Sequence, residues 1–350
     1  MTHPWPGWQD ELRAVLSASQ ERYRATGAVS APDVAGPHEL GRDWARAHRS
    51  LAPLLLAVED LTREAVRAVI TGADDDSGVP RLAANLRGAG VAVIRELLTG
   101  ARHSCSPVVP RPADQQLTAA NLLWGAHVPP EPGYAVIAAR SRHTGISDFG
   151  RCVDDALGAC GRPGFVHLLL DSGGYLLGPA HDEQDAVNLA LRLHEHLSGA
   201  VWLAVAWRAN TDVEEGRHEA SVVLDLVTSL AQPPGVYGVE DVVVEYALMQ
   251  DTSTLVALLS LIAPVVHQQS LRTTLETLTA TGGNRSKAAN ALDIHRSTLN
   301  YRLGRIEQLT GHTPNIAHGL QTLAAALTMY EVVHAPDPAD RWPEQVRAWV

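Results

Sequence analysis

The first third of the chain carries apolar residues at the spacing of amphipathic helices, three and four residues apart. The residues with this spacing are Leu12, Val15 and Leu16, then Leu51, Leu54, Leu55, Val58 and Leu61, then Leu82, Leu86, Val93, Ile94, Leu97 and Leu98. Stretches rich in Gly, Pro and Asp interrupt the pattern at 27–37 and 71–80, as turns do. The pattern predicts a helical sensor or interaction domain over residues 1–120.

Between residues 130 and 250 the period becomes strand-like. Runs at 134–139, 165–170, 175–178 and 201–207 predict strands, and segments 148–160, 183–197 and 213–230 predict helices. The order is β-α-β-β-α-β with a further helix, the split βαβ or ferredoxin-like plan. We expect a mainly antiparallel sheet with helices on one face. The chain as a whole is predicted to be a multidomain α+β protein.

Residues 255–335 return to helical spacing and predict an all-α domain, followed by a tail at 336–350. Gly282 and Gly283 end one helix, and Asn284 is a favourable N-cap for the next. A turn at 293–295, with Ile294 as an apolar plug, precedes a third helix that begins at Arg296. The residues predicted to be buried on this third helix are Leu299, Leu303, Ile306 and Leu309. Two helices joined by a tight turn predict a helix-turn-helix.

The third helix turns a polar face away from its apolar stripe, and in a helix-turn-helix this helix enters the major groove. Arginine can donate two hydrogen bonds to guanine and asparagine can pair with adenine, so Arg296 and Asn300 are the predicted base readers. Arg285, Ser286 and Lys287 open the preceding helix, where N–H groups and positive charge favour a phosphate.

Two further residues on this surface have alternative roles. The helical angle of Arg302 lies near the apolar stripe, so Arg302 either contacts a phosphate or pairs with an acid such as Glu276. His295 either contacts a base or caps the third helix, and we favour capping.

The charge distribution singles out the same segment. The chain carries a formal charge of -11, but residues 271–312 contain six basic and three acidic residues and are +3, which leaves -14 elsewhere. Lys287 is the sole lysine among 28 basic residues. An acidic protein with one basic segment is typical of a chain that binds a polyanion through that segment. A bundle of helices with solvated arginines is the less favoured interpretation.

The run GGNRSKAANALDIHRSTLNYRLGRIEQLTG resembles the C-terminal helix-turn-helix of PucR-type (purine catabolism regulator-like) transcriptional regulators and, more distantly, the Fis-type DNA-binding domain. Within this run the matching positions are Gly283, Asn284, Ser286, Ala288, Ala289, Leu292, His295, Thr298, Leu299, Tyr301, Arg302, Leu303, Ile306 and Gly311. With the resemblance, the predicted DNA-binding residues are Arg285, Ser286, Lys287, His295, Arg296, Ser297, Thr298, Asn300, Tyr301, Arg302 and Arg305.

Two other regions of the chain carry resemblances of their own. The middle region resembles the GGDEF-like domain that precedes this module, and GVYGVEDVVVEYALMQ resembles the segment that connects them. Residues 35–100 resemble the helical N-terminal domain of RsbR-type stress-signalling proteins. The resemblance implies a regulator and favours an activator over a repressor.

Enzymatic and metal-binding functions have little support. GGDEF cyclases place acids after two glycines, but Gly173 and Gly174 are followed by Tyr175, and the end of the first strand lacks an acid. We expect a degenerate, non-catalytic domain without a cofactor. The acidic run at 74–76 lacks the later EF-hand ligands, and neither an HExxH nor a Walker A motif occurs. We therefore predict no metal site.

The composition favours the cytoplasm. Three scattered cysteines, with no CxxC pair, argue against a disulfide framework. The N-terminus shows no signal peptide, and the most apolar segment is too short to span a bilayer. We predict a sequence-specific regulator that binds double-stranded DNA as a homodimer or larger oligomer and responds to a small molecule or signalling protein. The alternative is a signalling adaptor with a non-functional DNA module.

Overall fold

The computed structural model describes residues 7–26, 32–46, 51–72, 78–102, 112–124, 133–141, 146–162, 164–170, 173–197 and 200–334. They divide into two compact units: one contains the chain up to Arg67 and Arg81–Tyr246, and the other contains Ala68–Pro80 and Ala247–Ala335. The predicted tail at 336–350 and the acidic run at 74–76 lie outside the described residues.

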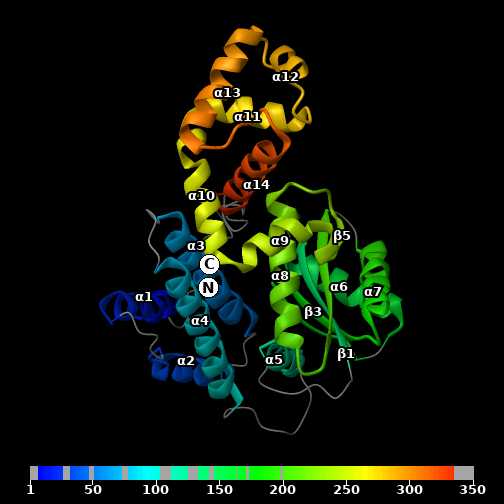
Figure 1. Cartoon of the computed structure of the whole chain (residues 1–350). Helices are drawn as coiled ribbons and strands as arrows, with labels where there is room; N and C mark the ends of the chain where they lie inside the picture. Colours follow the sequence, from blue (N-terminus) through cyan, green and yellow to red (C-terminus); the bar gives the residue numbers. More distant parts are fainter. Residues whose placement is uncertain are drawn as a thin grey trace. The chain divides into compact units, whose positions relative to one another are not determined.

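The described residues of the N-terminal part form five helices (Figure 1): α1 (Trp8–Thr26), α2 (Ala35–Arg46), α3 (Ala52–Thr71), α4 (Val79–Arg102) and α5 (Pro112–Leu123). The helical spacing in the sequence identified the buried faces of α1, α3 and α4: all the apolar positions named above are buried except Val15 and Leu61, which are half-buried. Helices α2 and α4 approach closely at glycines, because a Cβ on Gly41 would lie 2.1 Å from the carbonyl oxygen of Leu97.

The middle region forms a five-stranded mixed sheet. Its elements are β1 (Gly133–Ser141), α6 (Ile146–Cys160), β2 (Val166–Leu170), β3 (Gly173–Pro179), α7 (Glu183–His196), β4 (Val201–Ala209), α8 (Val213–Ser229) and β5 (Gly235–Tyr237). The strand order is β2-β3-β1-β4-β5. The pairs β2–β3, β3–β1 and β1–β4 are antiparallel, and β5 pairs with β4 in parallel.

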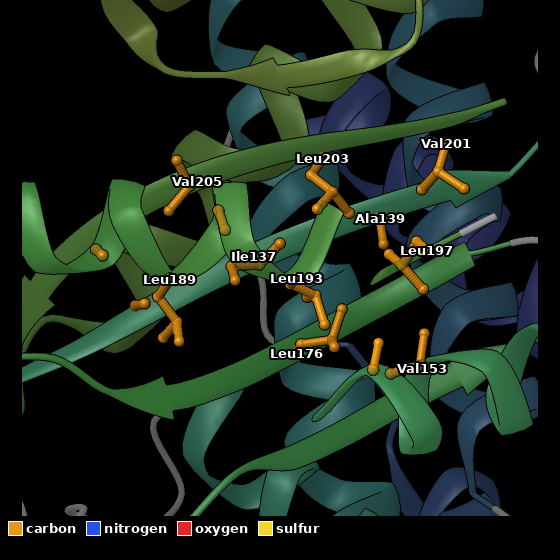
Figure 2. Close-up of a cluster of buried hydrophobic side chains, with 14 of the residues drawn as sticks. Ile137, Ala139, Val153, Leu176, Leu189, Leu193, Leu197, Val201, Leu203 and Val205 are labelled. Atoms are coloured by element: carbon orange, nitrogen blue, oxygen red, sulfur yellow. The ribbon is translucent and has the colours of Figure 1, made fainter. Parts of the chain in front are cut away.

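Helices cover both faces of this sheet. Ala135, Ile137 and Ala139 of β1 pack with Val153 of α6 and Leu189 of α7 (Figure 2). On the opposite face α8 packs against β1 and β4. The expectation of helices on one face only is wrong. Consecutive residues of β1 and β4 are apolar and buried, so each face of the sheet must be shielded from water.

A buried ion pair links α3 to α8 on this second face. Arg217 of α8 donates to Glu59 of α3 at 2.5 Å, and their side chains are only 8% and 15% exposed. Tyr175 of β3 also donates to Glu59 at 2.9 Å, while the Arg217 guanidinium lies 4.8 Å from the ring centroid of Trp124. Burial, reinforced by the Glu59 carboxylate, raises the pKa of Tyr175, so its hydroxyl stays protonated and donates.

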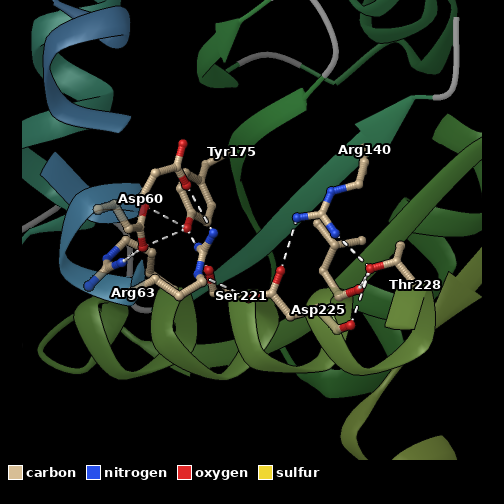
Figure 3. A network of polar contacts seen from close by, with 10 residues as sticks. Asp60, Arg63, Arg140, Tyr175, Ser221, Asp225 and Thr228 are labelled. Atoms are coloured by element: carbon tan, nitrogen blue, oxygen red, sulfur yellow. Dashed lines mark hydrogen bonds and ion pairs between the residues drawn. The ribbon is translucent and has the colours of Figure 1, made fainter. Parts of the chain in front are cut away.

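A second network surrounds Asp225 of α8 (Figure 3). Its two carboxylate oxygens accept from Arg140 of β1 at 2.9 Å and from Arg63 of α3 at 3.1 Å, and Arg140 also donates to Thr228 at 2.6 Å. Burial opposes ionisation of Asp225, but the two guanidiniums outweigh it and lower the pKa of the carboxyl. Arg140, near the end of β1, is thus paired with Asp225 of α8.

The C-terminal part of the chain is helical. After η1 (Val239–Val242) and α9 (Val243–Gln250) come α10 (Thr252–Val266), α11 (Gln269–Ala280), α12 (Arg285–Ala291), α13 (Arg296–Thr310) and α14 (Ala317–His334). One apolar cluster draws on all of α10 to α14. Among the described residues no single helix is long and apolar enough to cross a membrane. The pair Val239–Gln250 and Thr252–Val266, bent by 90°, passes on length and composition alone.

We expect Arg217→Met to lower the free energy of unfolding by about 3–5 kcal/mol, because it leaves the buried Glu59 carboxylate without its cation. The double variant Glu59→Gln/Arg217→Met should recover much of that loss. Urea denaturation followed by circular dichroism measures both, with the exposed Arg192→Met as the control. An Arg217→Met protein as stable as the control would contradict the assigned role of the pair.

Asp225 should make stability depend on pH in the acid range. Because its folded pKa is lowered, its stabilisation is complete above the unfolded pKa near 3.8 and is lost as pH falls through the folded value. The stability difference between the wild type and Asp225→Asn should therefore shrink on acidification below about pH 4. Thermal melts of both proteins from neutral to acid pH test this. A pH-independent difference would contradict it.

Candidate nucleic-acid interface

The turn between α11 and α12 is formed by two glycines and an asparagine. Gly282 and Gly283 have φ of 62° and 80°, and their amides donate to the carbonyls of Thr279 and Leu278, both at 2.9 Å. The Asn284 side chain accepts from the Lys287 amide at 3.0 Å. The predicted end of α11 at the glycines and the predicted N-cap of α12 at Asn284 are both present, so the predicted start of α12 is confirmed.

The turn between α12 and α13 contains a residue with a positive φ, Asp293, and an apolar residue that packs on the core, Ile294. Asp293 has a φ of 52°, the left-handed conformation that acidic and amide side chains tolerate better than most. Ile294 is half-buried and packs on the apolar cluster, together with the buried Ala288 and Ala289 of α12. These contacts fix α12 against the helices behind it.

Helix α13 begins at a histidine cap and ends at a glycine. His295 accepts from the Ser297 amide through Nδ1 at 3.3 Å and lies 2.7 Å from the Ser297 hydroxyl. Gly311, with a φ of 70°, ends the helix through its amide bond to the Glu307 carbonyl at 2.8 Å. Capping, the favoured role of His295, is therefore observed, while contact with a base remains a prediction.

Burial of one side of α13 leaves the opposite side exposed. Leu299, Leu303 and Ile306 are fully buried, whereas Leu309, also predicted to be buried, is half-buried. The predicted DNA-binding residues of α13 that are exposed are Arg296, Ser297, Thr298, Asn300, Tyr301 and Arg305. Tyr301 is 76% exposed, which is unusual for an aromatic residue in a small domain. The first turn of α12 adds the exposed Arg285, Ser286 and Lys287.

Arg302 does not lie with the exposed group. It is half-buried and donates to the Thr274 hydroxyl of α11 at 3.2 Å. Its suggested partner Glu276 instead accepts from Arg272 at 2.7 Å, and that hydrogen bond raises the pKa of Arg272. Pairing of Arg302 with Glu276 is therefore wrong. No sequence pattern predicted the contact with Thr274, because a threonine within a helix carries no charge that would indicate a partner for Arg302.

The six basic groups of this segment differ in how far neighbouring acids neutralise them. Arg272 is paired with Glu276 and with Glu331 at 3.4 Å. Arg285, Lys287 and Arg296 form no ion pair with any described residue, and Arg305 donates to the uncharged Gln308. The available positive charge therefore lies on α12 and α13, beside the polar face. No three metal-ligating side chains gather anywhere in the described part of the chain.

Comparison with known proteins identifies this segment. Residues 271–329 match the PucR C-terminal helix-turn-helix domain, from the start of the α11 apolar stripe to the middle of α14. No curated protein matches the chain. A solved structure, a regulator of polyketide synthase expression from Bifidobacterium adolescentis, has 16% sequence identity and a TM-score of 0.30, with 77% of this chain and 98% of that chain covered.

The Asn284 cap should hold the first turn of α12 in place. We expect Asn284→Ala to destabilise this turn by about 1 kcal/mol, because the Lys287 amide loses its acceptor. Hydrogen exchange of the full chain should then show faster exchange in α12. Asn290→Ala, an exposed asparagine on the same helix, is the matched control and should change little. Equal exchange in the two variants would show that the cap contributes nothing.

Proposed function

Because residues 271–329 form a PucR-type helix-turn-helix domain, we propose that the chain is a sequence-specific DNA-binding transcriptional regulator. The observation that carries the proposal is the polar, unpaired face of α13, which directly follows a tight turn. A helix fixed in this way by its apolar side can place its N-terminal residues against the base edges of the major groove.

Arg296 and Asn300 are the proposed base readers. They are four residues apart, so they lie on the same side of α13, and both are exposed near its N-terminal end. Neither side chain is held by a described residue, which leaves its donors and acceptors for a base. Ser297 and Tyr301 form the neighbouring row, where a hydroxyl can contact either a base or a phosphate.

Arg285, Lys287 and Arg305 are the proposed phosphate contacts, with Ser286 and Thr298 as neutral donors. Their role is to fix the register of α13, because phosphate contacts carry no sequence information. His295 and Arg302 are better suited to positioning: one caps α13 and the other fixes α13 to α11.

The rest of the chain serves this function as a regulatory part. We assign residues 130–250 to a degenerate GGDEF-like domain and residues 1–120 to an RsbR-like helical domain, followed by the DNA-binding domain at 255–335. One helix-turn-helix covers only a few base pairs, so a homodimer on paired half-sites is expected. A cytoplasmic location, activation of transcription, and the lack of catalysis and of a cofactor remain predictions.

DNA binding should weaken strongly as the salt concentration rises, and it should depend both on a base-reading side chain, Arg296, and on a phosphate-contacting side chain, Lys287. After selection of a preferred site from random duplexes, fluorescence anisotropy at several salt concentrations gives the affinity. We expect Arg296→Ala to cost about 1–3 kcal/mol on the preferred site and to relax the preference at one base pair. Lys287→Ala should weaken all duplexes alike and reduce the salt slope by about 0.9.

The control is Arg192→Ala, which removes one exposed positive charge outside the interface. It should leave both affinity and salt slope unchanged. If Arg296→Ala retained wild-type affinity and preference, the base-reading role would be refuted. If full-length protein bound no duplex at low salt, the regulator proposal itself would fail in favour of a signalling adaptor.

A further inference from the structure

A groove on the first unit lies between one side of α4 and the segment that precedes α2. Its volume is about 580 Å³, within the range of sites that bind small molecules. The apolar residues along it are Pro32, Val34, Val91 and Ala92. Gly88, which also lines the groove, is exposed, and a Cβ at this position would meet no atom within 4 Å.

Two of the three charged residues in the groove already have partners. Arg95 donates to Glu214 at 2.7 Å and to the carbonyl of Trp124 at 3.3 Å. Glu96 lies 2.5 Å from Nδ1 of His38. These groups fix the walls of the groove and have little capacity left for a ligand.

Arg87 is the exception. It is half-buried and has no acceptor or ion-pair partner among the described residues. Burial lowers the pKa of Arg87. The pKa of His218 is lowered by burial, then by Arg217 and by Arg87, while Glu59 acts in the opposite direction, so the positive charge of Arg87 is felt at His218. A half-buried cation without a counter-ion is costly, and an anionic ligand removes that cost.

We propose that this groove binds a small carboxylic acid with an apolar body. The carboxylate would accept from the Arg87 guanidinium, whose planar fork matches two carboxylate oxygens. The apolar body would lie along Val91 and Ala92, one turn further along α4, with Pro32 and Val34 opposite. The site requires both parts, because the carboxylate needs the cation and the apolar body needs the carbon surface of Pro32, Val34, Val91 and Ala92.

If the chain is the regulator proposed above, a carboxylic acid of this kind is its effector. Binding of the acid can be measured without DNA. The probes are matched pairs: 3-phenylpropionate and hexanoate with their primary amides, which have nearly the same shape and no charge. Ligand-observed NMR and calorimetry on the full chain measure the affinities. We expect saturable binding of the acids, with the amides at least about 10-fold weaker.

Three variants separate charge from shape. Arg87→Gln should weaken the acids by about 10- to 100-fold, whereas Arg81→Gln, an exposed arginine on the same helix outside the groove, should not. Gly88→Leu should block the groove while keeping Arg87. Arg87→Glu should lose the acids and bind the matching amines, 3-phenylpropylamine and hexylamine, instead.

Several results would overturn the proposal. They are equal affinity for acids and amides, wild-type affinity in Arg87→Gln, and no binding of either acid to the wild type at concentrations up to about 10 mM. Circular dichroism of each variant confirms that lost binding does not reflect lost folding. Because no step uses DNA, failure here leaves the DNA-binding proposal standing, and the reverse also holds.

Discussion

Burial of the apolar side of α13 is the constraint on which the proposed function depends. Leu299, Leu303 and Ile306 are removed from water by α10, α11, α12 and α14. The rotation of α13 about its axis is then fixed, since any other rotation would expose these side chains. Arg296 and Asn300 consequently lie on the solvent side of α13. The tight turns at either end of α12 hold α12 in place directly before α13.

The same requirement shapes the sheet region in a different way. Consecutive residues of β1 and β4 are apolar, so both faces of the sheet must be covered, and α8 packs against β1 and β4 on the second face. This arrangement buries charged side chains as well as apolar ones. Arg217 with Glu59, and Arg63 and Arg140 with Asp225, are tolerated there because each charge has a counter-ion.

Arginine has three different roles in this chain, and residue type alone does not distinguish them. Arg217 is structural, Arg296 is exposed and unpaired, and Arg87 is half-buried without a partner. Each role follows from burial and from the nearest acid. A count of net charge by region located the basic segment correctly, but it could not show that Arg272 is neutralised and Arg302 is held by a threonine.

The sequence by itself predicted the apolar faces of α1, α3 and α4, the strands β1 to β4 and the helix-turn-helix, but not the short strand β5. Gly283, Asn284 and Gly311 act within one or two turns of the chain, and apolar spacing is a property of neighbouring residues. The tertiary structure decided what depends on distant residues: that Glu59 of α3 pairs with Arg217 of α8, and that Arg302 contacts Thr274. It also left Arg87 without an acid. Those outcomes depend on contacts between residues far apart in the sequence, and no local pattern encodes them.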